Sequence, residues 1–119
     1  MTKKYQHITL EERTFIFAKK CRNFVFKLPK TVSNREYSKQ LIRSSGSQAA
    51  NYIEANEALS KKDFIYRVKI ARKETKESGL WLRLCETDND TNLILEQKDL
   101  IQESKELRSI FSTIIENSK

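Results

Sequence analysis

Residues 40–57 read QLIRSSGSQAANYIEANE, a stretch that has helical apolar spacing and an opposite face of unusually short side chains. At about 100° per residue, Ile42, Tyr52 and Ile53 fall on one side of a helix. The opposite side, within roughly 100°, presents Arg43, Ser47, Ala50, Asn51 and Glu54. A helix that faced only water would carry long charged side chains there, whereas short side chains admit another backbone. The stretch therefore predicts a helix that is packed on both sides.

The composition extends this preference for helices to the whole chain. Among 119 residues there is one proline, Pro29, and there are two glycines, Gly46 and Gly79. Leu, Ile, Ala, Glu, Lys and Arg dominate, which favours helices over strands. A chain of this length also buries a core of its own. We therefore expect an all-α protein with a single domain over residues 1–119.

Hydrophobic periodicity predicts four helices, at about residues 10–28, 35–58, 61–87 and 93–117. Pro29 ends the first helix, because proline disfavours a helical conformation in the residue before it. Short connections make consecutive helices antiparallel neighbours, so the predicted architecture is an up-down-up-down antiparallel four-helix bundle. The expected N-caps are Thr9, then Ser33 or Asn34, then Ser60, and for the last helix one of Asp90, Thr91 and Asn92.

The chain lacks the residue clusters that most catalytic and metal sites need. His7 is the only histidine, and Cys21 and Cys85 have neither CxxC spacing nor histidine companions. The two glycines form no loop that could hold a phosphate. We therefore expect no enzymatic activity, no catalytic residue, no metal and no cofactor. Both cysteines are interpreted as small buried core residues.

The sequence also favours a cytoplasmic protein that does not contact membranes. Its N-terminal apolar residues are interrupted by charges, so they do not resemble a signal peptide. No run of about 18 apolar residues is present to span a bilayer.

The formal net charge of +7 is distributed unevenly along the sequence. Residues 1–34 hold eight Lys or Arg against two acids, and residues 35–76 hold ten against five, whereas residues 77–119 hold five against nine. A basic field over two thirds of the chain favours a polyanionic partner, with nucleic acid ahead of membrane. The alternative is that these charges only solvate a small protein.

The predicted third helix carries the candidate nucleic-acid-binding residues. Four lysines project within about 60° of one another along roughly 21 Å of helix, and two arginines flank them. Such a stripe can follow several phosphates; the alternative is a face that is only solvated. Tyr66 is the only aromatic residue nearby, so we expect recognition of backbone or shape rather than of bases. The candidates are Lys62, Lys69, Lys73 and Lys76, with Arg72 and Arg83 on the flank.

A second surface suggests contact between copies of the chain. On the other flank of the same helix, Ile70 and Trp81 lie roughly 20° apart, with acidic residues between them. This acidic strip and the arginine of the second helix suit a head-to-tail contact, which closes into a ring when the rotation permits. The alternative for Trp81 is a place in the core. The expected interface residues are Arg43, Ser47, Asn51, Glu54, Glu74, Glu77 and Trp81.

Three stretches resemble a known family: QLIRSSGSQAANYIEA at 40–55, SKKDF at 60–64 and IARKETKESGLWL at 70–82. They are similar to the bacterial four-helix-bundle family related to the 23S rRNA intervening-sequence proteins, over about residues 17–84. Many members have a glycine after the glutamate, where this chain has Ala55 and Asn56, which leaves room for the second helix to run on. The matching residues are Gln40, Arg43, Ser47, Asn51, Glu54, Ser60, Asp63, Phe64, Ala71, Lys73, Glu74, Glu77, Trp81 and Leu82.

The resemblance implies a four-helix protomer, a ring-shaped homopentamer and a basic surface. Members include proteins encoded within rRNA intervening sequences and the accessory variability proteins of retroelements, which bind nucleic acid and a reverse transcriptase. No catalytic residue is implied. The leading hypothesis is a non-enzymatic, homo-oligomeric accessory protein that binds RNA or DNA. The alternative is an assembly or scaffold module that binds another protein and has no direct nucleic-acid role.

Overall fold

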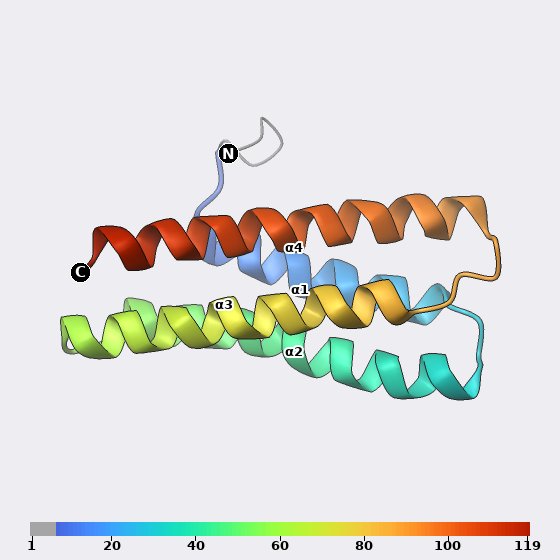
Figure 1. The fold of residues 1–119 in the computed structure, drawn as a ribbon, viewed down its shortest axis with the longest axis horizontal. Helices are drawn as coiled ribbons and strands as arrows, with labels where there is room; N and C mark the ends of the chain where they lie inside the picture. The colour runs from blue at the N-terminus through green and yellow to red at the C-terminus, as the bar shows by residue number, and fades with distance from the viewer. Residues whose placement is uncertain (1–6) are drawn as a thin grey trace.

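The computed structural model describes residues 7–119, in which the helices are α1 (Leu10–Lys27), α2 (Val32–Asn56), α3 (Lys61–Leu84) and α4 (Thr91–Asn117). Consecutive helices run antiparallel and pack side by side (Figure 1). Because α1 also contacts α4, the bundle is closed and α1 lies diagonally across from α3. The predicted all-α, up-down-up-down four-helix bundle is confirmed. Residues 1–6, which include Lys3 and Lys4 of the basic N-terminal region, lie outside the described residues.

A side-chain cap precedes each of the four described helices, and three of these caps are predicted residues. Thr9, Ser60 and Asp90 each accept a hydrogen bond from the backbone N–H three residues further on, at 3.0–3.1 Å. These bonds satisfy donors that have no partner inside the helix. Asp90 is the cap among its three candidates, so α4 begins at Thr91, slightly before the predicted start. The connection to Ser60 begins after Asn56, so α2 does not run on.

The start of α2 corrects the predicted cap. Thr31, rather than Ser33 or Asn34, caps this helix, and its Oγ1 accepts a hydrogen bond from the Asn34 N–H at 3.0 Å. The Asn34 side chain is occupied elsewhere, because its Nδ2 donates to the carbonyls of Pro29 and Glu86 at 3.0 and 2.9 Å. Its Oδ1 accepts from the Glu86 N–H at 2.8 Å. Asn34 thus joins the α1–α2 connection to the end of α3, and α2 begins three residues earlier than predicted.

The end of α3 also differs from the prediction, because α3 stops three residues earlier than expected. Gln97 of α4 donates through Nε2 to the carbonyls of Leu82 and Cys85 at 2.7 and 2.9 Å. These are acceptors that the last turn of a helix leaves open. Asp88 and Asn89 follow with φ of 53° and 59°, a left-handed conformation that short polar side chains tolerate.

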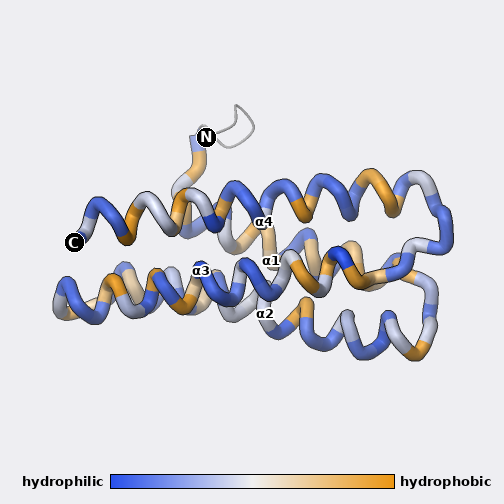
Figure 2. Tube along the Cα trace, viewed as in Figure 1, coloured by the Kyte–Doolittle hydropathy of each residue, from blue (hydrophilic) through white to orange (hydrophobic). Residues whose placement is uncertain are grey.

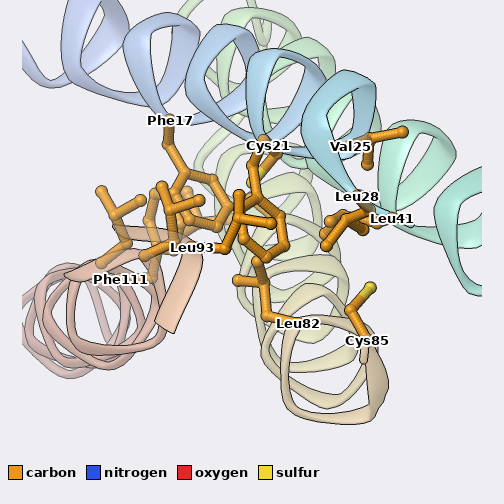
Figure 3. Close-up of a cluster of buried hydrophobic side chains, with 14 of the residues drawn as sticks. Phe17, Cys21, Val25, Leu28, Leu41, Leu82, Cys85, Leu93 and Phe111 are labelled. Carbon is orange, nitrogen blue, oxygen red and sulfur yellow. The ribbon is translucent and has the colours of Figure 1, made fainter. Parts of the chain in front are cut away.

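The hydrophobic core lies along the axis of the bundle and takes residues from all four helices (Figure 3). Phe17, Phe24, Leu41, Leu82 and Phe111 are at most 1% exposed. Figure 2 shows apolar and hydrophilic positions alternating along each helix, as expected when one stripe of every helix faces its neighbours. Burial of these side chains is the main favourable term in folding such a bundle.

The two cysteines are buried free thiols, as predicted. Burial raises the pKa of both, because a thiolate is poorly solvated away from water, and it raises the pKa of Cys85 to about 11. Cys21 and Cys85 are therefore protonated and unreactive near neutral pH.

One arginine that the sequence analysis did not single out lies inside the bundle. Arg13 of α1 is fully buried, and its partner Glu103 of α4 is 7% exposed. Arg13 donates through Nε and Nη2 to the two carboxylate oxygens of Glu103 at 2.8 and 2.7 Å, and through Nη2 to Glu106 at 3.1 Å. The hydrogen bond to Glu103 is the chief cause of a raised Arg13 pKa. A charged pair thus links α1 to α4.

Candidate nucleic-acid interface

The predicted lysine stripe lies on the solvent face of α3. Its inward-facing positions are spaced three and four residues apart, which leaves the lysines on the opposite side of the helix. The lysines Lys62, Lys69, Lys73 and Lys76 are all exposed. The buried positions between them include Val68, Ala71, Thr75, Ser78 and Leu82.

Most lysines of this stripe have no ion-pair partner within the described residues. Among residues 7–119, no carboxylate forms an ion pair with Lys62, Lys69 or Lys76. Lys73 Nζ lies 3.9 Å from Glu74 Oε1, at the limit of ion-pair distance. Exposed cations without partners keep their field available to a polyanion.

The two flanking arginines differ in their surroundings. Arg72 is half-buried, and its Nη1 donates to Ser112 Oγ of α4 at 3.3 Å. Arg83 is exposed and, together with Lys76, lines a groove of about 270 Å³ between α3 and α4. The stripe therefore borders a concave surface, with Leu80 among the groove's lining residues.

This α3–α4 groove adds two cations that the sequence analysis did not assign to the site, Lys105 and Arg108 of α4. The two helices approach closely here, since a Cβ on Gly79 would lie 3.1 Å from Ser104 Oγ. The acidic balance of residues 77–119 does not mark α4 as a basic surface. The sequence nevertheless indicates this surface, because Lys105 and Arg108 are three residues apart and such residues share a face of a helix.

The predicted oligomer-interface residues of α2 and α3 contact one another within the chain. Arg43 Nη2 lies 3.4 Å from a carboxylate oxygen of Glu74 and 3.4 Å from one of Glu77. Asn51 Oδ1 accepts a hydrogen bond from Arg67 of α3 at 3.2 Å. Asn51 Nδ2 donates to the Ser47 carbonyl at 2.9 Å. The backbone that the short side chains admit is therefore that of α3, the helix with which α2 packs most extensively.

Two residues of the predicted interface set have polar groups without a partner in the described residues. Glu54 is exposed and forms no ion pair with another part of residues 7–119. Trp81 is half-buried and stacks on Tyr37 with ring centroids 6.1 Å apart. Its Nε1 is buried and finds no hydrogen-bond acceptor in the part of the chain that the structure describes. The interface assignment of the seven residues stays a prediction.

Within residues 7–119, no group of three or more His, Cys, Asp or Glu side chains is arranged to hold a metal ion. None of the described helices is long and apolar enough to cross a membrane.

A protein-family model matches most of this sequence. A model of the 23S rRNA-intervening sequence protein matches residues 6–113, which include α1 to α3, most of α4 and every residue of the stripe and the groove. The chain belongs to the 23S rRNA-intervening sequence protein family. The family resemblance of residues 17–84 is thereby confirmed and extends through most of α4.

A solved protein structure is similar to this chain in fold and sequence. It is a protein of unknown function from the S23 ribosomal protein family of Bacteroides thetaiotaomicron, 28% identical to this chain, with a TM-score of 0.75. The match covers 90% of this chain and 98% of that chain. No curated protein matches this member of the 23S rRNA-intervening sequence protein family. Neither the family description nor the solved structure names an enzymatic activity.

Proposed function

We propose that this family member is a non-enzymatic, homo-oligomeric accessory protein of the cytoplasm that binds RNA or DNA through the basic face of α3 and α4. A ring of five copies, as the family resemblance implies, repeats this face around the particle. Repetition strengthens binding to a long polyanion, because each further contact with the same strand is intramolecular.

The exposed, unpaired lysines of α3 carry this proposal. Lys69 and Lys76 have no carboxylate partner in the described residues, and Lys105 and Arg108 face Lys76 across the α3–α4 groove. Cations from two helices can contact phosphates on both sides of a strand that follows the groove. Because phosphate contacts carry no sequence information, the binding is expected to be largely independent of sequence.

The test is a salt titration of binding, with a fluorescent single-stranded RNA and a DNA duplex as probes. The stripe variant combines Lys69→Glu, Lys73→Glu and Lys76→Glu. Loss of three phosphate contacts to a single strand lowers the slope of log K against log salt by about 2. At 0.1 M salt the same relation gives about a 100-fold loss of affinity.

A variant of equal net charge separates the stripe from general electrostatics. It combines glutamate substitutions of Lys30, Lys39 and Lys119, three exposed lysines outside α3 and the α3–α4 groove. This control is expected to keep most of the affinity. Equal losses in both triple variants would remove the assignment of the surface. Unchanged affinity of the stripe variant in low salt, or a defined protein partner in a preparation free of nucleic acid, would favour the scaffold alternative.

A further inference from the structure

The α3–α4 groove differs from the rest of the basic face, because cations of two helices converge there on a concave surface. Lys76 and Arg83 of α3 line its volume of about 270 Å³ together with Lys105 and Arg108 of α4. Lys76 and Arg83 are seven residues apart, which corresponds to about 10 Å along α3. Four positive charges thus surround a short and concave site.

The acids of the two helices that form the groove are directed to other helices. On α3, Glu74 and Glu77 each have a carboxylate oxygen 3.4 Å from Arg43 of α2. On α4, two glutamates contact Arg13 of α1. Among the described residues, no carboxylate lines the groove, and no ion pair includes one of its four cations.

The neighbouring helix positions supply hardly any negative charge either. Residues three and four positions away on a helix are the side-chain neighbours of a given residue. At these positions around the four cations the sequence has one acid, Glu86, which accepts a hydrogen bond from Ser33 Oγ at 2.7 Å. Converging cations without a counter-charge repel one another, so an anion between them is favoured.

The remaining lining residues offer little that could recognise a base or a sugar. Leu80 and Ile101 are apolar, and Ser104 Oγ already donates to the Ile101 carbonyl at 2.7 Å. No aromatic side chain is among the described residues that line the groove, so a base has no ring on which to stack. Apolar walls also concentrate the field of the cations. The groove therefore selects its ligand by negative charge.

The charge of the groove fits several linked phosphate groups better than a single one. Each phosphate of a nucleic-acid backbone carries one negative charge. A terminal phosphate group carries about −1.5 to −2 near neutral pH. Two further phosphate groups in a triphosphate bring the total to about −4, which balances four cations.

We propose that the α3–α4 groove binds a chain of linked phosphate groups, supplied by the 5′-triphosphate end of an RNA strand. The choice of RNA as the source rests on the proposed function. The groove begins at Lys76, where the lysine stripe ends. A strand whose 5′ end lies in the groove can therefore continue along the stripe toward Lys62. The groove thereby adds a preference for one end of the strand to binding that is otherwise independent of sequence.

The test compares two single-stranded RNAs of identical sequence, one with a 5′-triphosphate and one with a 5′-hydroxyl. Each carries a fluorophore at the 3′ end, and binding is measured by fluorescence anisotropy. EDTA in the buffer removes metal ions that would neutralise the phosphates. At 0.1 M salt the triphosphate RNA is expected to bind at least about 10-fold more tightly, because additional phosphate contacts release additional counterions.

Three double variants assign this preference to the groove. Lys105→Gln with Arg108→Gln, the groove variant, is expected to lose the preference for the triphosphate. Lys105→Arg with Arg108→Lys keeps both charges and is expected to retain it. Lys30→Gln with Lys39→Gln has the same net charge as the groove variant but lies outside the groove, and is also expected to retain it. Circular dichroism confirms that each variant is helical.

Inorganic tripolyphosphate distinguishes the end of a strand from a free ligand of the same chemistry. It is expected to displace the triphosphate RNA but to bind more weakly, because the RNA also contacts the lysine stripe and its second contact is intramolecular. Tripolyphosphate that binds as tightly as the triphosphate RNA would show that the strand contributes nothing, and would overturn RNA as the source.

Two results with RNA would overturn the inference while the proposed function stands. One is equal affinity of the wild-type protein for both RNAs, with the affinity for both lost in the stripe variant. The other is a preference for the triphosphate that persists in the groove variant, which would place the 5′ end elsewhere.

Failure of the proposed function has a different signature. If neither RNA binds, while tripolyphosphate binds the wild-type protein and not the groove variant, RNA binding is refuted and the phosphate site of the groove is supported. If neither RNA nor tripolyphosphate binds the wild-type protein, the inference and the proposed function are both wrong.

Discussion

The buried Arg13–Glu103 pair gives the sharpest stability prediction for this bundle. The perturbations are Arg13→Met, Glu103→Leu and their combination. Arg13 is fully buried and Glu103 is 7% exposed, so removal of either partner leaves a charge where water cannot easily reach it. Breaking one side of such a pair typically costs about 3–5 kcal/mol, whereas apolar replacement of both sides is often nearly neutral.

The surroundings of the pair determine where within this range the cost of each single substitution falls. In the Glu103→Leu variant, Glu106 still lies 3.1 Å from Arg13 Nη2, with a side chain that is 26% exposed. We therefore expect a cost near the low end, about 3 kcal/mol. In Arg13→Met, two carboxylates lose their shared cation, and about 3 kcal/mol or more is expected. The double variant is expected to lose less stability than either single variant, which corresponds to a coupling of at least about 3 kcal/mol.

Urea denaturation followed by circular dichroism measures these differences, with the midpoint and slope recorded for all four proteins. Lys27 and Glu96 supply a matched control, because they also link α1 to α4, at 3.1 Å, but with side chains 57% and 29% exposed. Their cycle is expected to give less than about 1 kcal/mol of coupling. Additive losses at Arg13 and Glu103, or a coupling no larger than that of the control pair, would refute the reasoning.

The remaining predictions concern backbone, polar and thiol sites. Gly46→Ala is expected to raise the free energy of unfolding of the dissociated chain by about 0.5–1 kcal/mol. Gly79→Ala is expected to give no such gain, because a Cβ there would lie 3.1 Å from Ser104 Oγ. Urea denaturation compares the two variants. Asn34→Ala removes three hydrogen bonds of a side chain that is 2% exposed and is expected to cost about 2–3 kcal/mol by the same assay. Burial raises the pKa of Cys85 to about 11. The stability that the protonated thiol contributes is therefore present below the unfolded-state pKa near 9 and is lost as the pH rises toward 11. Thermal unfolding between these pH values is expected to show this loss of stability, and Cys85→Ser is expected to reduce it.

Helix formation and capping were largely predictable from the sequence, because periodicity and cap chemistry are local. Ser60 and Thr9 cap as predicted for this reason. The cap of α2 was not predictable in the same way, since Asn34 is diverted by Glu86, a residue distant in the sequence. The core position of Arg13 was missed because an arginine in a helix normally indicates a solvent face, and only the bundle brings Glu103 to it.

The candidate site illustrates the same limit for charge. Counted along the sequence, residues 77–119 hold nine acids against five Lys or Arg, so the net charge of this part of the chain is negative. In the bundle, however, Glu103 and Glu106 turn toward Arg13, and Glu96 pairs with Lys27, so these carboxylates are directed to α1. The side of α4 that faces the α3 stripe then presents Lys105 and Arg108.

This separation has a consequence for the proposed function. Glu96, Glu103 and Glu106 neutralise cations of α1. The α3–α4 groove is lined by cations from both of its walls. If the α3–α4 groove contributes phosphate contacts, the double variant Lys105→Glu with Arg108→Glu should weaken RNA binding. The loss of affinity per substituted residue should be about as large as in the stripe variant, although both residues belong to the acidic part of the chain. The same pair should leave the particle mass unchanged, because neither residue is among the predicted interface residues. An RNA affinity that survives this reversal while the stripe variant loses it would restrict the interface to α3 alone.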